Sequence, residues 1–226
     1  MPTIMIVGAS RGIGLEMAKQ YRQAGWRVHA TYRTDKQPLE ALGGDLHTHQ
    51  LEVTSAADIA ALKKRLADEP IDILCYNAGI YGQYNDYLGN TDDELWLQTL
   101  RVNTLAALNV IVALAENVSK SERRIVAAMS SKMGSMSDNS SGGSYVYRSS
   151  KAALNAVMKS LSIDLADQYD ITTIILHPGW VITDMTGTNA LITAAESVRG
   201  MSNVLGFCRP AHNGSFFDYR GNLLPW

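Results

Sequence analysis

The sequence has few cysteines and no long basic run, the features that would indicate an oxidising compartment or a polyanionic partner. It contains two cysteines, Cys75 and Cys208, which offer at most one disulfide, and Cys75 lies within an apolar run. A reduced, cytoplasmic environment is therefore favoured over secretion. The formal net charge is -2, and Lys63, Lys64 and Arg65 are the only three consecutive basic residues. This charge pattern predicts neither a nucleic acid nor an anionic membrane as a partner.

Long apolar segments and a leader are also missing from the sequence. No apolar run approaches the ~18 residues of a membrane-spanning helix, and the N-terminus lacks the charged-then-apolar order of a signal peptide. The 226 residues, 46% of them hydrophobic and 19% charged, are enough for a full core. We therefore expect a soluble protein in which residues 1–226 form a single domain.

Short apolar runs alternate with helical patterns along the whole chain. The predicted strands are residues 3–7, 27–31, 45–50, 71–76, 124–129, 171–176 and 214–219. Ser55 is predicted to cap a helix that runs to about residue 67, and Thr91 and Thr193 each open a capping box with a glutamate three residues later. Strands that alternate with helices predict an α/β protein with a doubly wound parallel sheet, the Rossmann fold.

The first predicted strand runs directly into the turn Gly8-Ala9-Ser10-Arg11-Gly12-Ile13-Gly14 and then into a helix. In such a turn Gly8 permits the tight bend, Gly12 lets the backbone approach a pyrophosphate, and Gly14 lets the helix pack close to the strand. The helix N-terminus presents free N–H groups to the anion. The spacing differs from the dinucleotide fingerprint G-x-G-x-x-G, so a tight connection without a ligand is the alternative.

The same turn also fits a second functional pattern. Residues 8–12 match G-x-S-x-G, the nucleophile elbow of hydrolases, and a later aspartate with His177 or His212 would complete a triad. That elbow follows several strands of a sheet, whereas only one strand precedes this turn. A hydrolase is therefore kept only as the third hypothesis.

The end of the second predicted strand bears on the choice of dinucleotide. An NAD site places an acidic residue about 20 residues beyond the glycines, where it binds the ribose hydroxyls. Tyr32 and Arg33 stand there instead, and Arg11 lies in the glycine turn itself. Two guanidinium groups near the adenosine ribose suit a 2′-phosphate, which predicts NADP. Two solvated surface arginines are the alternative.

Two Tyr-x-x-x-Lys pairs occur in the sequence. On a helix Tyr147 and Lys151 share a face, and an ammonium near a phenol favours the phenolate, so the pair can act as a general acid–base device. Tyr32 and Lys36 have the same spacing, but Tyr32 closes a strand. We interpret Tyr147 and Lys151 as the functional pair.

Polar residues at the third and fourth predicted strands are further candidates for ligand binding. His47 and His49 alternate along the third strand without cysteines or carboxylates at ligand spacing, so we interpret them as strand residues and predict no metal site. Asn77-Ala78-Gly79 closes the fourth strand, where small residues and an amide fit close backbone approach to a ligand.

The long helix after Thr91 is apolar on two faces. Asn103, Ala107 and Val110 lie on one of them. Leu105, Leu108 and Val112 lie roughly opposite. A monomer would expose the second apolar face to water, which predicts a homodimer or homotetramer. The alternative is that other segments of the same chain cover this face.

In their order along the chain, these motifs resemble those of the short-chain dehydrogenase/reductase family over essentially the full length. The motifs are Gly8-x-x-x-Gly12-Ile13-Gly14, Asn77-Ala78-Gly79, Asn103, Ser131, Tyr147-x-x-x-Lys151 and Pro178-Gly179. Each is weak alone, but together they are highly specific. Residues 148–155 and the ending from Phe217 to Trp226 look like those of the C-factor and Sniffer carbonyl reductase group.

The resemblance implies an NADPH-dependent carbonyl reductase. Tyr147 would donate a proton to the carbonyl oxygen, Ser131 would hold that oxygen, and Lys151 would lower the pKa of Tyr147 and bind the nicotinamide ribose. Asn103 would position a water that links Lys151 to solvent. The implied cofactor-binding residues are Gly8, Ser10, Arg11, Gly12, Ile13, Gly14, Tyr32, Arg33, Leu51, Glu52, Val53, Asn77, Ala78, Gly79, Tyr147, Lys151, Pro178, Gly179, Val181 and Thr183.

The sequence departs from the family pattern at three places. Val7 replaces a threonine that is common there, and Glu52 replaces the usual aspartate near the adenine. The separation between Ser131 and Tyr147 is a few residues longer than the family norm, which predicts a bulging loop. Ser130 and Ser135 are therefore alternatives for the serine role, although Ser131 keeps the family's spacing to Gly134.

The residues expected to face the substrate are apolar or aromatic: Met133, Tyr145, Trp180 and Met185, with Tyr81 at the mouth. Lys132 is the only basic residue among them. Residues 185–192 are fewer than in the lid of many relatives, which predicts an open site for neutral, fairly hydrophobic aldehydes or ketones. Ordinary core packing is the alternative for these side chains. A non-catalytic nicotinamide sensor on the same fold is the alternative function.

Overall fold

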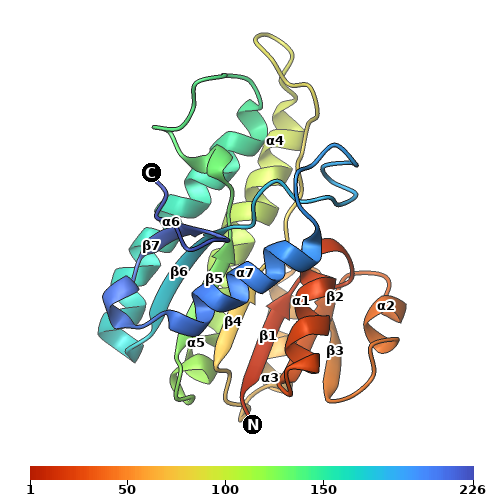
Figure 1. The fold of residues 1–226 in the computed structure, drawn as a ribbon, viewed down its shortest axis with the longest axis vertical. Coiled ribbons are helices and arrows are strands. Elements are labelled where there is room, and N and C mark those ends of the chain that lie inside the picture. The colour runs from red at the N-terminus through yellow and green to blue at the C-terminus, as the bar shows by residue number, and fades with distance from the viewer.

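Seven parallel strands form the sheet of the computed structural model, which describes residues 1–226 (Figure 1). Their order is β3-β2-β1-β4-β5-β6-β7, and every pairing is parallel. The strands are β1 Thr3–Val7, β2 Arg27–Tyr32, β3 Leu46–Gln50, β4 Ile73–Tyr76, β5 Ile125–Met129, β6 Thr172–His177 and β7 Ser215–Asp218. The predicted α/β fold and all the predicted strands are confirmed, with small shifts at the strand ends.

Helices cover both faces of this sheet. They are α1 Gly12–Gln23, α2 Gln37–Glu40, α3 Ala56–Arg65, α4 Asp93–Leu100, α5 Ala106–Ser119, α6 Tyr145–Tyr169 and α7 Ala194–Phe207. A π-helix, η1 Arg101–Leu105, joins α4 to α5, and two 3₁₀ turns are η2 Lys132–Gly134 and η3 Pro210–His212. The short helix α2 was not predicted.

The sheet separates two hydrophobic cores. On one face α3, α5 and α6 pack against it, with Leu62, Val110 and Leu154 fully buried. On the other face α1 and α7 contribute Met17 and Met201. Because both faces are covered, the strands read as continuous apolar runs rather than alternating ones, which is why the sequence revealed them. Both cysteines are free, and Cys75 is buried in the second core.

The hydrogen bonds at the N-termini of the helices test the predicted N-cap residues. The Ser55 hydroxyl accepts a hydrogen bond from Asp58 N at 3.2 Å, as predicted. The box between Thr193 and Glu196 is also confirmed, with both reciprocal bonds present. The box at Thr91 is wrong, because Asp92 caps α4 one residue later, and its carboxylate accepts from Leu95 N at 3.0 Å. A carboxylate caps at least as well as a hydroxyl, and here it lies directly before the first helical residue.

The continuous helical run Asp93–Ser119 is long and apolar enough, by length and composition alone, to cross a membrane. Its inner side, including Ala107, Val110 and Leu114, is buried in the first core. Leu105 and Val112 are 52% and 54% exposed. Two residues of the predicted second face, Leu105 and Val112, therefore lie at the surface, whereas Leu108 is partly buried and packs against the first core.

Candidate active site

The loops that follow β1, β4, β5 and β6 meet at one edge of the sheet, because all strands run in the same direction. The glycine turn after β1 packs against the segment after β4. Gly8 has φ +85°, and a Cβ there would lie 2.7 Å from the Cα of Ala78. The side-chain nitrogen Nδ2 of Asn77 donates to the Gly8 carbonyl at 2.6 Å. A Cβ on Gly14 would meet that same carbonyl at 2.2 Å, so side chains are sterically excluded at both glycines.

The start of α1 suits an anion. No side chain caps this helix, whose N-cap residue is Arg11, so its first N–H groups stay available at the edge of the sheet. Arg11 lies 3.8 Å from Asp184, and both side chains are largely exposed. Arg33, which follows β2, is also exposed, and Tyr32 beside it is half-buried. These residues fit a dinucleotide whose ribose carries a 2′-phosphate.

The segment after β3 lies beside the end of β2, where Leu51 N donates to the Tyr32 carbonyl at 2.9 Å. Leu51 and Val53 are buried, and Glu52 is partly exposed. The Glu52 carboxylate accepts from the Thr54 N–H at 3.1 Å and from its hydroxyl at 2.9 Å. The carboxylate therefore closes its own turn, which accounts for an acidic residue at this position without any adenine contact.

The segment after β6 crosses the glycine turn. A Cβ on Gly12 would lie 3.5 Å from the Thr183 methyl group. Val181 is buried, and the Thr183 hydroxyl lies 3.0 Å from that of Thr186. Pro178 is buried and Gly179 has φ +86°. The predicted cofactor-binding segments after β1 and after β6 thus lie side by side.

Lys151 lies on α6 with its ammonium beneath the edge of the sheet. It is 4% exposed, and Nζ donates to the Met129 carbonyl at the end of β5 at 2.9 Å. The same nitrogen lies 5.7 Å from the centre of the Tyr147 ring. Burial lowers the pKa of Lys151 to about 8, because a charged ammonium is poorly solvated there.

Tyr147 occupies the third position of α6. Burial raises the pKa of its phenol to about 12, against the opposing effect of a hydrogen bond with Ser131, while Tyr81 and Tyr84 raise it further. This direction is the opposite of the one that the family resemblance implied. The physical reason is that desolvation of the phenol outweighs the stabilisation of a phenolate.

The structure separates the three candidate serines. The Ser130 hydroxyl donates to Asn155 Oδ1 on α6 at 2.5 Å, and the Ser135 hydroxyl donates to the Trp226 carbonyl at 3.2 Å. Ser131 accepts from Met133 N at 3.1 Å, and of the three serines it is the one that acts on Tyr147, where it lowers the pKa of the phenol. Ser131 is therefore the serine that adjoins Tyr147.

Asn103 lies in the π-helix η1 and is fully buried. Its amide accepts from Ile80 N at 2.9 Å and donates to Ile80 O at 2.8 Å and to the Ser150 hydroxyl at 3.0 Å. A Cβ on Gly79 would lie 3.2 Å from Asn103 Oδ1 and 3.6 Å from Lys151 Nζ. Asn103 therefore ties the loop after β4 to α6 beside the lysine. Wide turns of this kind are frequent at functional sites.

The candidate substrate residues line the outer part of this region. Tyr145 and Trp180 are 39% and 49% exposed, and Met133 and Met185 are partly buried. Tyr84, which the sequence analysis missed, donates from its hydroxyl to the Met185 carbonyl at 3.1 Å. Tyr84 therefore connects the loop after β4 to the segment after β6. A tyrosine in an irregular loop carries no periodic signal, so the sequence could not reveal this contact.

The competing motifs do not assemble into a site. The Lys36 ammonium pairs with Glu40 at 2.7 Å and Lys36 precedes α2, so it shares no helix with Tyr32. No hydrogen bond joins Ser10 to His177 or His212, as a hydrolase triad would require.

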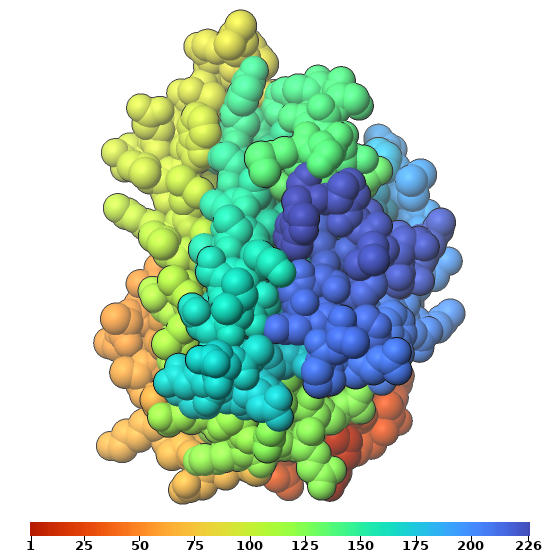
Figure 2. Space-filling model, turned by 90° about the vertical axis from the view of Figure 1, so that its left-hand side faces the viewer, coloured from red at the N-terminus to blue at the C-terminus, as the bar shows by residue number.

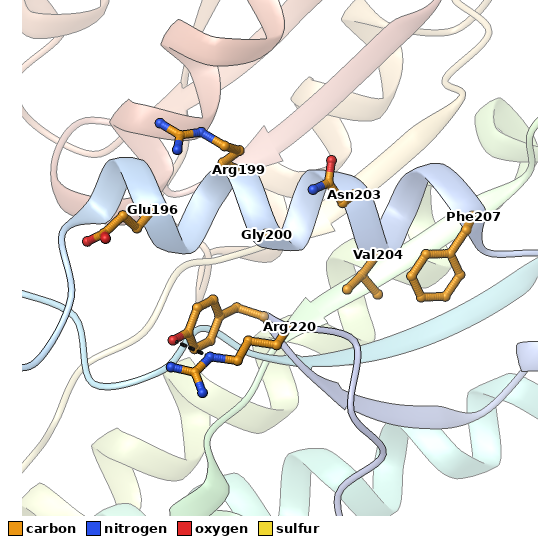
Figure 3. A pocket seen from close by; sticks show the side chains of 8 residues that line it. Glu196, Arg199, Gly200, Asn203, Val204, Phe207 and Arg220 are labelled. Atoms are coloured by element: carbon orange, nitrogen blue, oxygen red, sulfur yellow. Dashed lines mark hydrogen bonds between the residues drawn. The ribbon is translucent and has the colours of Figure 1, made fainter.

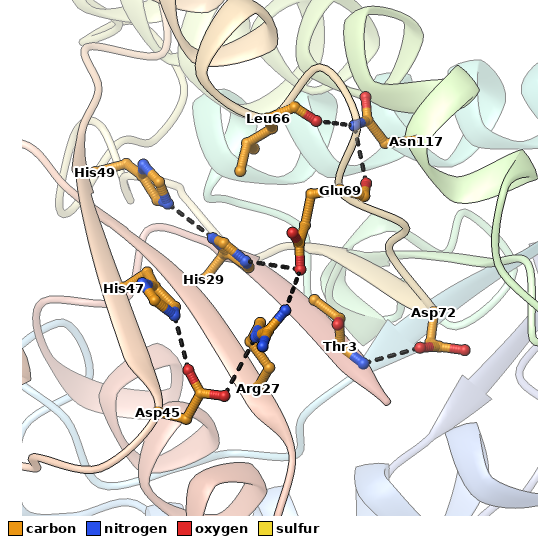
Figure 4. A network of polar contacts seen from close by, with 10 residues as sticks. All are labelled: Thr3, Arg27, His29, Asp45, His47, His49, Leu66, Glu69, Asp72 and Asn117. Atoms are coloured by element: carbon orange, nitrogen blue, oxygen red, sulfur yellow. Dashed lines mark hydrogen bonds and ion pairs between the residues drawn. The ribbon is translucent and has the colours of Figure 1, made fainter. Parts of the chain in front are cut away.

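Two surface hollows lie away from these residues. One, of about 250 Å³, lies between α7 and the turn at Tyr219 and Arg220 (Figure 3). The other, of about 500 Å³, contains the stacked histidines His29, His47 and His49 near the start of β2 (Figure 4). Neither includes a residue of the candidate site.

Comparison with known sequences finds one family and a large set of similar proteins. The family model described as short chain dehydrogenase matches residues 2–191. The C-signal protein of Myxococcus xanthus is 43% identical over 157 residues, which are 70% of this chain and 93% of that protein.

Solved structures are similar over the whole chain. The carbonyl reductase Sniffer of Drosophila melanogaster is 30% identical, with a TM-score of 0.91 and 100% of both chains covered. A short-chain dehydrogenase/reductase of Burkholderia multivorans, solved with bound NADP, is 35% identical, with a TM-score of 0.90 over 100% of this chain and 99% of that chain.

Proposed function

This chain belongs to the short-chain dehydrogenase family, and on that premise we propose that it is an NADPH-dependent carbonyl reductase. One observation carries the proposal: the Lys151 ammonium lies 5.7 Å from the centre of the Tyr147 ring, beside Ser131, which lowers the pKa of the Tyr147 phenol. This is the donor set that reduction of a carbonyl needs. A relative of similar fold is a carbonyl reductase, and another binds NADP, which supports the same reading. Two free cysteines accord with the reduced cytoplasm as its location.

Each residue of the site has a defined task in this reaction. Bound NADPH supplies the hydride that the carbonyl carbon accepts. Tyr147 donates its phenolic proton to the carbonyl oxygen, and Ser131 donates a hydrogen bond to the same oxygen. Lys151 stabilises the phenolate that remains and binds the nicotinamide ribose. Asn103 positions a water through which Lys151 exchanges protons with solvent.

The cofactor is held by the residues of the sheet edge. The free N–H groups at the start of α1 bind the pyrophosphate, and Arg11 and Arg33 bind the 2′-phosphate. The segments 51–53 and 77–79 line the adenosine side, and the segment 178–183 lines the nicotinamide side. The N-terminus of α1, which no side chain caps, is the structural support for this assignment.

The substrate side favours a neutral carbonyl compound. Met133, Tyr145, Trp180 and Met185 provide an apolar and aromatic lining. Lys132 pairs with Asp138 at 3.1 Å, and the Arg148 guanidinium donates to the Met133 carbonyl and the Ser141 hydroxyl, so both nearby cations are already engaged. A carboxylate substrate would want a free cation that this region lacks. Hydrophobic walls discriminate a methylene group by only ~1–3 kcal/mol, so we expect loose specificity.

A paired substrate screen tests the function. Purified protein is assayed for NADPH oxidation, by absorbance, with neutral aldehydes and ketones and with keto acids of similar size. We expect higher kcat/KM for the neutral carbonyls. Higher values for the keto acids would overturn the substrate class. Tight NADPH binding without turnover of any carbonyl would overturn the reductase and favour a cofactor sensor.

A further inference from the structure

The loop between β4 and α4, residues 80–92, lies over the start of helix α6. Its Tyr81 ring stacks on the Tyr147 ring with centres 4.6 Å apart and planes 14° apart. Tyr84 stacks on Tyr81 at 4.6 Å and 10°. The Tyr84 hydroxyl reaches the Met185 carbonyl on the other wall of the site. A continuous aromatic stack therefore ends on the proposed catalytic acid.

The same loop caps the helix that carries Tyr147. The N-cap residue of α6, Ser144, has a left-handed backbone with φ 51°, and its side chain does not cap the helix. Asp86 caps the helix in place of the Ser144 side chain. The Asp86 carboxylate accepts from Val146 N at 2.7 Å, and the Asp86 backbone carbonyl accepts from Ser144 N at 3.2 Å. The first turn of α6 contains no acidic residue of its own. The helix dipole therefore receives its negative partner from a different part of the chain.

The burial of Asp86 distinguishes it from an ordinary surface cap. The residue is 4% exposed, and its second carboxylate oxygen, Oδ1, has no hydrogen-bond partner. Keeping a carboxylate in such surroundings is costly, so its bond to the helix has to compensate. The Tyr81 hydroxyl adds a contact at 3.1 Å to the Ser144 hydroxyl. The loop thus holds the ring of Tyr147 and the backbone immediately before it.

We propose that residues 80–86 of this loop position the catalytic acid, with Asp86 fixing the first turn of α6 and Tyr81 fixing the ring plane of Tyr147. Both act through Tyr147 and are therefore positioning residues. Helix ends fray, and a misplacement of about 1 Å in a reacting group costs about 10²-fold in rate. The kinetic consequence rests on the proposed function, whereas the ordering of the first turn does not.

The test of Asp86 uses a matched capping residue. Asp92 caps α4 in the same way, through Leu95 N at 3.0 Å, without a bond to α6. We expect Asp86→Ala to lower kcat by about 10²-fold with little change in KM for NADPH. Asp86→Asn, which keeps an accepting oxygen, should recover most of the rate. Asp92→Ala should lose thermal stability without this loss of kcat.

Amide hydrogen exchange gives a readout that does not depend on turnover. Asp86→Ala should accelerate exchange in the first turn of α6, residues 146–149, and Asp92→Ala should leave it unchanged. If the two variants have equal kcat and equal exchange in this turn, the inference is overturned while the reductase function stands. If the wild type reduces no carbonyl, the function fails, and the exchange result still decides the positioning role.

The role of Tyr81 is tested by two substitutions. Tyr81→Phe keeps the ring and loses the Ser144 contact, so most of the rate should remain. Tyr81→Ala removes the stack and should lower kcat strongly. The Tyr147 phenol, followed by NMR of labelled tyrosine rings, should then titrate at lower pH than in the wild type. An unchanged titration and an unchanged kcat in Tyr81→Ala would overturn the proposed role of the ring, and this variant also decides the proposal if Asp86→Ala does not fold.

Discussion

The ammonium of Lys151 lies 5.7 Å from the centre of the Tyr147 ring, yet it donates its hydrogen bond to the Met129 carbonyl at the end of β5. Strand β5 thus anchors the lysine, and the lysine faces the tyrosine from within the fold. Burial lowers the pKa of the lysine to about 8 and raises that of the tyrosine to about 12. Both shifts favour the neutral side chains.

Substitution of the tyrosine tests its role as the acid. Tyr147→Phe removes the phenolic oxygen and should leave NADPH binding nearly intact, while turnover falls by at least ~10²–10⁴-fold, as for loss of a general acid. Tyr32→Phe is the matched control, since Tyr32 ends β2 and belongs to the competing Tyr-x-x-x-Lys pair. Steady-state kinetics and NADPH titration measure both. Similar losses in the two variants would show that the assignment of Tyr147 is wrong.

The lowered pKa of Lys151 predicts that kcat falls at alkaline pH. Its lowered pKa means that the ammonium is present below about pH 8 and is lost as the pH rises through that value. Reduction should therefore slow above about pH 8, where the charge that stabilises the phenolate disappears. The profile of kcat against pH measures this limb. Lys159→Met, which removes an exposed ammonium from the same helix, should leave the profile unchanged. A flat profile between about pH 7 and 9 would contradict this role of Lys151.

The exposed arginine after β2 predicts the choice of cofactor. Arg33→Asp should erase or invert the preference for NADPH over NADH, because it replaces a cation beside the 2′-phosphate with an anion. A charge-assisted hydrogen bond is worth roughly 1.5–3 kcal/mol, which is about ten- to a hundredfold in affinity. Arg209→Asp, in the connection that leads into β7, is the control. Equal affinity of the wild type for the two cofactors would refute the prediction.

The outer face of the long helical run predicts an assembly of copies. Figure 2 shows α6 lying between the α4–α5 segment and the C-terminal segment on one side of the molecule. Leu105, Val112 and Ile163 are 52%, 54% and 63% exposed. We propose that this apolar face packs against its copy in a homodimer or homotetramer.

Charge substitution on that face provides the measurement. Leu105→Glu and Val112→Glu should lower the mass measured by light scattering at micromolar concentration. Leu223→Glu, at another exposed leucine, should not. A wild-type monomer under these conditions would contradict the assembly.

The histidine cluster predicts a loss of stability in acid. His29 Nδ1 and His49 Nε2 lie 2.9 Å apart in a buried pair (Figure 4), and Glu69 lies 3.6 Å from His29 Nε2. Burial lowers the pKa of His49 to about 4 and also lowers that of His29. The unfolded chain binds these protons near pH 6.5, about 2.5 units above the pH at which the folded chain binds that of His49. The free energy of unfolding should therefore fall as the pH drops from about 6.5 to 4, by up to ~1.4 kcal/mol per pH unit for each proton.

Denaturant titrations at several pH values measure this slope. His49→Gln removes one of the titrating rings and should flatten the acid slope. His212→Gln, on η3 outside the cluster, is the control. The same slope in His49→Gln as in the wild type would show that the cluster does not carry the acid sensitivity.

The sequence by itself determined the strands, their alternation with helices, and the glycine turn. These features depend on forces that act within a few residues: apolar runs wherever both faces of a strand are buried, and a steric limit at Gly8 and Gly14. The spacing of Tyr147 and Lys151 was also readable, because one helix turn brings them to one face. The cap at Thr91 was placed wrongly because neighbouring residues, here Asp92, compete for the same position within one turn.

Only the tertiary structure decided which groups meet at the site. The sequence left three serines open. The bonds of Ser130 to Asn155 and of Ser135 to Trp226, and the effect of Ser131 on the pKa of Tyr147, distinguish them. The predicted direction of the pKa shift of Tyr147 was wrong, because desolvation depends on what packs around the ring. The cap from Asp86 to Val146 spans 60 residues and starts in an irregular loop. Such contacts have no period in the sequence, since they arise only when the folded sheet brings distant loops to one edge.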